Sequence, residues 1–133
     1  MSYMSDRRET HRIPLKLFLN EYVNERMHRA MTTNLSPTGL YVHRLAGMKG
    51  LQFGREDRYV QVELQLPGTS DTIWARGEVR YDDLALDPLI HGTGIFLSDI
   101  ARGHARMLKE FVIDTKRQRL QQILELVRRN RYQ

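Results

Sequence analysis

Two short polar segments, residues 7–12 and 34–39, carry the residue types that bind small anionic ligands. The residues concerned are Arg7, Arg8 and Arg12 in the first segment and Asn34, Ser36 and Gly39 in the second. A guanidinium can bind a phosphate through two parallel hydrogen bonds and can also stack on a nucleobase. A turn with short polar side chains lets the edge of a ligand approach the backbone closely. Together the segments predict a site for a small, doubly anionic ligand that carries bases.

Residues 13–33 are predicted to form the hairpin that brings the two segments together. Apolar and polar residues alternate over 13–20, which is the periodicity of a strand. Residues 24–26 are typical of a hairpin turn, and 28–33 are predicted as its return strand. Residues 1–12 are polar and aperiodic, so we expect a flexible basic arm there. Because antiparallel strands place the start of the first beside the end of the second, the arm and the 34–39 turn are expected to be neighbours.

Four further strands are predicted, over residues 39–43, 59–66, 72–81 and 92–97. In 72–81 the alternation places Trp74 and Arg76 together on the outward face. Six short strands separated by turn signals predict a mainly β protein, a small antiparallel barrel over residues 13–100 that leaves no open sheet edge.

Residues 101–133 change to helical periodicity, with a basic interruption at 116–119 between two apolar groups. These groups are Leu108, Phe111 and Val112, then Leu120, Ile123, Leu124 and Val127. The first group is expected to pack on the barrel. The second extends beyond what a barrel of this size can cover, so we expect a helix from another copy of the chain to cover it. The alternative is a helix that folds back onto its own domain or frays in solution.

Length and composition restrict the function further. The chain has 133 residues and a hydrophobic content of 41%, enough for one core but not for a second catalytic domain. Because it has no cysteine, disulfides, thiolate catalysis and cysteine-ligated zinc are excluded. Its five histidines lack the spacing of a metal-binding pair. It also has no run of 18 apolar residues and no secretory signal, so we expect a cytoplasmic protein without membrane insertion. We expect no cofactor.

The net charge of +5 is unevenly placed, because basic residues crowd residues 7–16 and 116–131. Such patches attract polyanions nonspecifically at low salt, and this attraction alone does not define a function.

The paired pattern Arg8-x-x-x-Arg12 and Asn34-x-Ser36-x-x-Gly39 resembles the signature of PilZ domains, bacterial receptors for the second messenger cyclic di-GMP. The likeness continues through residues 74–77 and 92–96 and covers roughly residues 7–113. It implies a six-stranded PilZ barrel over 13–100, preceded by a ligand-binding arm over 1–12 and followed by a long helix over 101–133. It implies a receptor and adaptor for motility or biofilm regulation rather than an enzyme.

The resemblance also implies roles for single residues. Arg8 and Arg12 would hold the phosphates and guanine faces, while Asn34, Ser36 and Gly39 would meet the guanine edges or a phosphate. Arg7 matches a position where a basic residue accompanies binding of a stacked pair of ligands. Trp74 and Arg76 would line the ligand surface. We expect the arm to close on cyclic di-GMP and thereby change the surface that an unknown downstream protein contacts.

Two other functions are open on the sequence. Barrels with basic arms and exposed aromatic residues such as Phe18, Tyr41 and Trp74 also bind single-stranded nucleic acid. An enzyme is disfavoured because no nucleophile and base, carboxylate pair or metal spacing stands out. Each motif alone is also explained more simply. Arg102 and Arg106 repeat the Arg-x-x-x-Arg spacing, residues 36–39 make an ordinary turn, and a lone tryptophan is often partial core.

Overall fold

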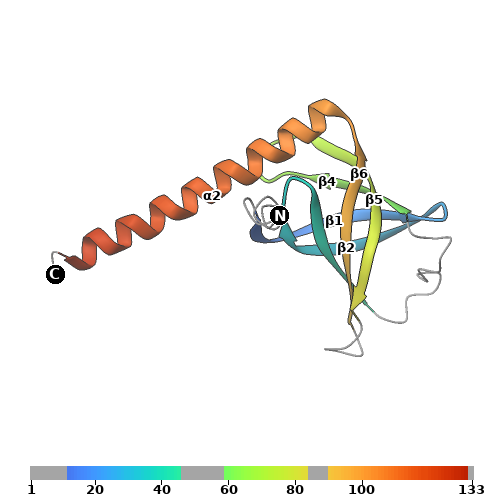
Figure 1. The fold of residues 1–133 in the computed structure, drawn as a ribbon, viewed down its shortest axis with the longest axis horizontal. Helices are drawn as coiled ribbons and strands as arrows, with labels where there is room; N and C mark the ends of the chain where they lie inside the picture. Colours follow the sequence, from blue (N-terminus) through green and yellow to red (C-terminus); the bar gives the residue numbers. More distant parts are fainter. Residues whose placement is uncertain (1–11, 46–58, 84–89, 132–133) are drawn as a thin grey trace, which may run out of the picture.

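The computed structural model describes residues 12–45, 59–83 and 90–131. These residues form six antiparallel strands and one long helix (Figure 1). The strands are β1 (Ile13–Val23), β2 (Arg26–Leu35), β3 (Gly39–Leu45), β4 (Tyr59–Gln65), β5 (Thr72–Asp83) and β6 (Ile90–Ile100), followed by helix α2 (Arg102–Arg131). The strands close into a barrel in the order β1-β2-β3-β6-β5-β4, which confirms the predicted fold class. The predicted arm lies outside the described residues except for Arg12.

The hairpin of β1 and β2 fixes the position of the predicted site. Asn24 and Glu25 form its two-residue turn with φ angles of 50° and 66°, the left-handed conformation that suits the twist of paired strands. The return strand begins at Arg26, two residues before the predicted start. Pro14 lies opposite Asn34 at the other end of the hairpin. The predicted approach of these two chain segments is therefore confirmed for the part of the arm that is described.

Alternation of apolar residues on the strands fills the barrel. The buried apolar side chains include Leu19, Leu35, Val42, Val62, Leu64, Ile73 and Ile95. On β5 the alternation turns Ile73 and Ala75 inward and Trp74 and Arg76 outward, as predicted.

An ion pair also lies inside the barrel, which the sequence did not indicate. Glu21 on β1 and Arg44 on β3 are 0% and 3% exposed. Arg44 Nε donates to Glu21 Oε1 at 2.6 Å, and further hydrogen bonds join Arg44 to the second carboxylate oxygen and to the buried Thr93 hydroxyl. Both charges are thereby compensated within the core.

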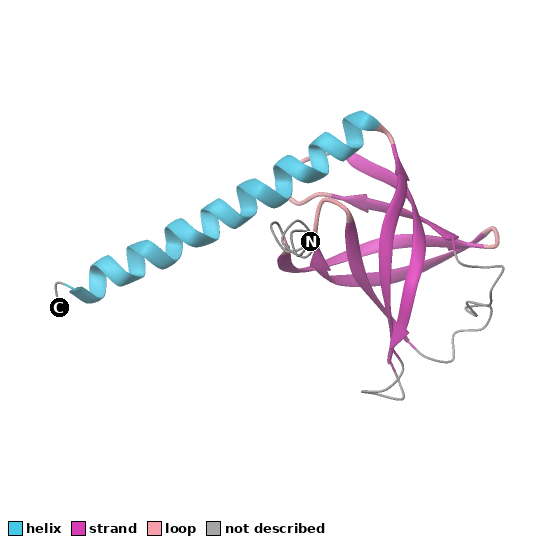
Figure 2. Cartoon of the chain, viewed as in Figure 1, coloured by secondary structure: helices cyan, strands magenta, loops and turns pink. Residues whose placement is uncertain are grey.

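The buried apolar contacts between helix α2 and the barrel come from the first half of the helix. Leu108 and Val112 are fully buried, and Met107 and Phe111 pack beside them. Beyond Arg119, which donates a hydrogen bond to the Pro14 carbonyl, the helix leaves the barrel and runs into solvent (Figures 1 and 2). Its last turn carries Arg128, Arg129 and Arg131, which interact favourably with the negative end of the helix dipole. No helix among the described residues is long and apolar enough to span a bilayer.

Candidate ligand-binding site

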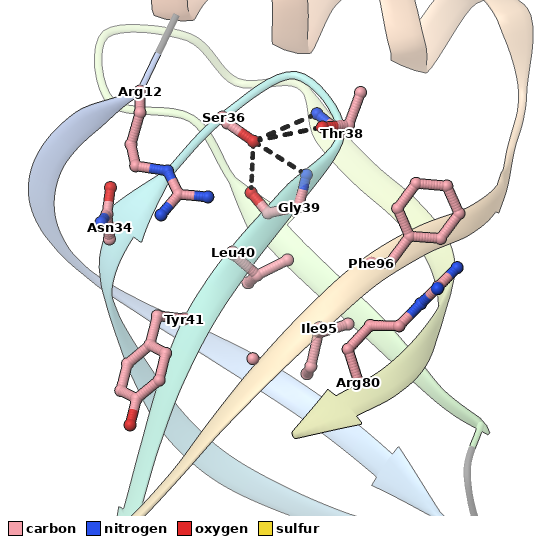
Figure 3. Close-up of a pocket in the computed structure, with 11 residues that line it drawn as sticks. Arg12, Asn34, Ser36, Thr38, Gly39, Leu40, Tyr41, Arg80, Ile95 and Phe96 are labelled. Atoms are coloured by element: carbon pink, nitrogen blue, oxygen red, sulfur yellow. Dashed lines mark hydrogen bonds between the residues drawn. The ribbon is translucent and has the colours of Figure 1, made fainter. Parts of the chain in front are cut away.

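A surface pocket of about 400 Å³ lies where the start of β1 meets the turn between β2 and β3. Its size is typical of small-molecule sites. β5 and β6 form its opposite wall (Figure 3). The lining residues are Arg12, Asn34, Ser36, Thr38, Gly39, Leu40, Tyr41, Arg80, Gly94, Ile95 and Phe96. Four of the eight residues predicted from the sequence are thus brought together.

Arg12 contributes the positive charge at the hairpin side of the pocket. It is the first described residue and is exposed, and its guanidinium points into the pocket toward the β2–β3 turn (Figure 3). The hairpin register places it close to Asn34, because Pro14 pairs with Asn34. Arg7 and Arg8 lie outside the described residues.

Asn34 carries a buried acceptor that lacks a partner. Its Oδ1 atom has no hydrogen-bond partner among the described residues. The β2–β3 pairing shifts register between Thr32 and Asn34, and such a bulge re-aims the side chain that follows it. Burial of an acceptor without a donor costs roughly 1–3 kcal/mol. A ligand N–H group in the pocket would remove that cost.

Ser36 shapes the turn. Its hydroxyl oxygen accepts hydrogen bonds from the backbone N–H groups of Thr38 and Gly39, at 3.3 and 3.0 Å. The hydroxyl donates to the Gly39 carbonyl at 3.1 Å, and the Ser36 N–H donates to the same carbonyl at 2.9 Å. The contacts of the Ser36 hydroxyl are dashed lines around the turn in Figure 3. Ser36 is 4% exposed, and its hydroxyl already has hydrogen-bond partners, so the residue acts on the pocket through the shape of the turn.

Gly39 is required by the packing of β3 on β6. A Cβ atom at this position would lie 2.6 Å from the backbone oxygen of Ile95. Leu97 also donates its N–H to the Thr38 carbonyl at 2.8 Å, which holds the turn against β6. The close approach of these strands forms the floor of the pocket, and a side chain on Gly39 would force them apart.

Arg80 and Phe96 form the wall opposite Arg12, and the sequence reasoning missed both. The Arg80 guanidinium carbon lies 4.6 Å from the centre of the Phe96 ring, a cation–π arrangement. Arg80 Nε also lies 2.9 Å from Glu78 Oε1, and its side chain is 55% exposed. The alternation of residues 72–81 places Arg80 on the outward face of β5. It does not reveal which residue of β6 lies beside Arg80, because the pairing of β5 with β6 is interrupted by two irregularities.

Trp74 and Arg76 do not line this pocket. The Trp74 ring lies 5.7 Å from the Tyr22 ring, and its backbone N–H donates to His104 Nδ1 at 3.2 Å. The Arg76 guanidinium lies 4.3 Å from the centre of the Tyr59 ring. The structure therefore gathers them in a separate group on the outer face, next to the start of α2.

Tyr22 in that group has a perturbed acidity. Loss of hydration raises the pKa of the Tyr22 hydroxyl, and its hydrogen bond to Glu63 and the charge of that carboxylate raise the pKa further. The hydroxyl donates to Glu63 Oε1 at 3.2 Å, and Asn20 donates to the same oxygen at 3.0 Å. Tyr22 is thus held neutral as a donor, which suits a structural contact.

The sequence profile of the PilZ domain matches residues 6–114. The chain belongs to the PilZ domain family. This confirms the resemblance drawn from the two motifs. PilZ domains are receptors for cyclic di-GMP that catalyse no reaction, in agreement with the expectation that the chain is not an enzyme.

Two solved structures share the PilZ fold of this chain. One is the inhibitor of motility MotI/DgrA of Bacillus subtilis, with 21% identity over 82% of this chain and 51% of the other, at a TM-score of 0.69. The second is PlzA of Borreliella burgdorferi in complex with c-di-GMP, with 10% identity over 86% of this chain and 55% of the other, at a TM-score of 0.54. The chain spans about half the length of these proteins. No curated protein matches it significantly in sequence.

Proposed function

We propose that the chain binds cyclic di-GMP in the pocket between Arg12 and the β2–β3 turn. The observation that carries this proposal is the pairing of an inward-pointing guanidinium with the unpartnered buried Asn34 Oδ1 in one pocket. The first group can bind a phosphate and stack on a purine, and the second can accept from a guanine N–H. A ligand with both features satisfies both groups.

The arm supplies the remaining cations in this proposal. Arg7 and Arg8 stand five and four residues before Arg12 in the sequence, and in this proposal they bind the ligand phosphates together with it. Each charge-assisted hydrogen bond contributes about 1.5–3 kcal/mol, from which the ordering of the arm subtracts. Residues 1–12 close over the ligand and change the surface available to a downstream partner. Arg7 favours a stacked pair of ligands over one.

Arg80 and Phe96 add a second stacking surface. Their cation–π pair stands across the pocket from Arg12. A purine bound between Arg12 and this pair would contact the Arg12 guanidinium on one face and the Arg80–Phe96 pair on the other. Trp74 and Arg76 lie in the separate outer-face group. The proposal therefore assigns them a smaller contribution to ligand affinity than Arg80 and Phe96.

Titration calorimetry with cyclic di-GMP tests this proposal. Arg12→Ala should weaken binding by about ten- to a hundredfold, the loss of one or two charge-assisted hydrogen bonds. Lys16→Ala is the matched control, because it removes one exposed positive charge four residues further along the chain, on β1 and outside the pocket. Equal weakening by both variants would show that only the net charge of the protein matters, and it would contradict the proposed site.

The same titration with a single-stranded oligonucleotide tests the alternative function. The exposed aromatic residues Phe18, Tyr59, Trp74 and Phe96 lie on four different strands, β1, β4, β5 and β6. We therefore expect only weak binding that falls steeply with salt. Tight oligonucleotide binding without a saturable response to cyclic di-GMP would favour the nucleic-acid function.

A further inference from the structure

Helix α2 has two apolar faces that point in different directions. Leu108, Phe111 and Val112 contact the barrel. Each helical residue turns the chain by about 100°, so the group of Leu120, Ile123, Leu124 and Val127 is rotated from these by roughly a third of a turn. The side chains of this second group are 52–56% exposed. Because the rotation turns them away from the barrel face, the chain's own barrel does not cover them.

This exposed group is part of a heptad seam. Positions alternately three and four residues apart run along the seam: Ile113 and Lys116, which are half-buried, and then Leu120, Ile123, Val127 and Asn130, which are exposed. Such spacing is the pattern of a coiled coil, in which the a positions here hold 113, 120 and 127 and the d positions hold 116, 123 and 130. All six positions lie within the uninterrupted helix Arg102–Arg131. The partner that this surface fits is therefore another helix.

The flanking positions of the seam identify the partner helix as a second copy. They alternate between arginine and leucine, with Arg117, Leu124 and Arg131 on one side and Arg119 and Leu126 on the other. In a parallel pair of helices, positions 119 and 126 of one helix face positions 124 and 131 of the other, five residues further along. Leu126 then faces Arg131, and Arg119, whose guanidinium donates to the Pro14 carbonyl of its own barrel, presents its aliphatic stem to Leu124. No two arginines meet, and each stem covers a leucine.

Other partners fit these flanks less well. In an antiparallel pair centred on Ile123, Arg117 would face Arg131, and the two like charges would repel. A partner helix with carboxylates along both flanks would place some of them against Leu124 and Leu126, which cannot pair with them. The charge pattern thus favours parallel copies of this same segment.

We propose that the second half of α2 is a self-association element that forms a parallel coiled coil with other copies of the chain. Leucine at an a position followed by isoleucine at d, as in Leu120 and Ile123, favours three or four strands over two. Apolar residues at the flanking positions 124 and 126 widen the buried surface in the same direction. The barrels sit beside the seam on the outside of this assembly, because each packs on a helix face that is rotated from the second apolar group by roughly a third of a turn.

Sedimentation velocity on the full chain without nucleotide tests this inference independently of ligand binding. We expect a mass that rises with concentration to three or four times the 15.7 kDa of one chain. Ile123→Glu should weaken association by about a hundredfold or more, because it buries a charge in every strand of the seam. Gln122→Glu is the matched control, since it adds the same charge on the outer face of the helix and should keep the assembly.

Salt and cross-linking distinguish the remaining partners. Self-association of so basic a segment should strengthen with added salt, whereas binding to an acidic protein or to vesicles containing phosphatidylglycerol should weaken. Because the chain lacks cysteine, an Asn130→Cys variant should form a disulfide between parallel copies and Gln122→Cys should not. A single-chain mass at every concentration overturns the proposal, and so does vesicle binding without association in solution. Failure of Asn130→Cys to cross-link overturns the parallel arrangement.

Discussion

Arg119 Nη1 donates a hydrogen bond of 2.6 Å to the backbone carbonyl of Pro14, 105 residues earlier in the chain. This bond joins the middle of α2 to the start of strand β1. Pro14 pairs with Asn34, and Arg12 lies two residues before it. The helix is therefore tied to the strand end that carries the candidate ligand site, at a point just before the exposed group that begins at Leu120.

Loss of this bond should loosen the helix locally. Arg119→Ala is expected to speed hydrogen exchange in the middle of α2 and at the start of β1 by about fivefold, the effect of roughly 1 kcal/mol of lost local stability. The exposed Arg117 serves as the control, and Arg117→Ala should leave the start of β1 unchanged. Identical exchange in the two variants would show that the Arg119 contact is unimportant in solution.

Two arginines on the same face of β5 distinguish the pocket seen in the structure from the site predicted from the sequence. Arg80 lines the pocket and Arg76 does not. Arg80→Ala should therefore weaken cyclic di-GMP binding by about five- to thirtyfold through loss of a stacking cation, while Arg76→Ala should change it by less than about twofold. Calorimetry on the two variants decides the matter. The reverse ranking would place the ligand over the outer-face group instead.

Gly39 and Gly103 should respond oppositely to the same substitution. Gly39→Ala would press a methyl group against the Ile95 backbone oxygen and is expected to cost about 1–3 kcal/mol of stability. No atom lies within 4 Å of a Cβ placed at Gly103, which is helical, so Gly103→Ala should stabilise the protein by up to about 1 kcal/mol. Urea unfolding measures both. A stable Gly39→Ala protein would mean that β3 and β6 are less tightly held than described.

The buried ion pair of the barrel gives a prediction about stability alone. Glu21→Ala leaves Arg44 charged in the core and is expected to cost about 3–5 kcal/mol. A double change, Glu21→Leu with Arg44→Met, removes both charges and should recover most of this loss. The free energies of unfolding of the single and double variants test the coupling. A double variant as unstable as the single one would show that the pair matters through packing and not through charge.

The sequence predicted those parts of the fold that depend on local patterns. Alternation located the six strands, and the two-residue turn at Asn24 and Glu25 fixed the hairpin that places Arg12 near Asn34. The change to helical spacing located α2 and its exposed second half. In each case the signal lies within one strand, one turn or one helix, where the chain itself sets the geometry.

The opposite wall of the pocket could not be predicted in this way. Arg80 and Phe96 meet because β5 and β6 pair with irregularities between residues 76 and 77 and between 79 and 81, and no local pattern reveals such shifts. Alternation correctly turned Trp74 and Arg76 outward, but it cannot say how far along the strand the pocket lies. The ion pair of Glu21 and Arg44 was hidden for a related reason, since each charge is explained only by its partner on another strand.

The most direct test of the central claim is a nuclear magnetic resonance titration of the labelled chain with cyclic di-GMP. The ligand should shift the side-chain amide of Asn34 and the backbone amide of Gly39, because the first gains a hydrogen bond to its Oδ1 and the second lies in the pocket. The indole signal of Trp74, the only tryptophan of the chain, should move much less. Shifts confined to Trp74 and its neighbours, with Asn34 unchanged at saturation, would contradict the account.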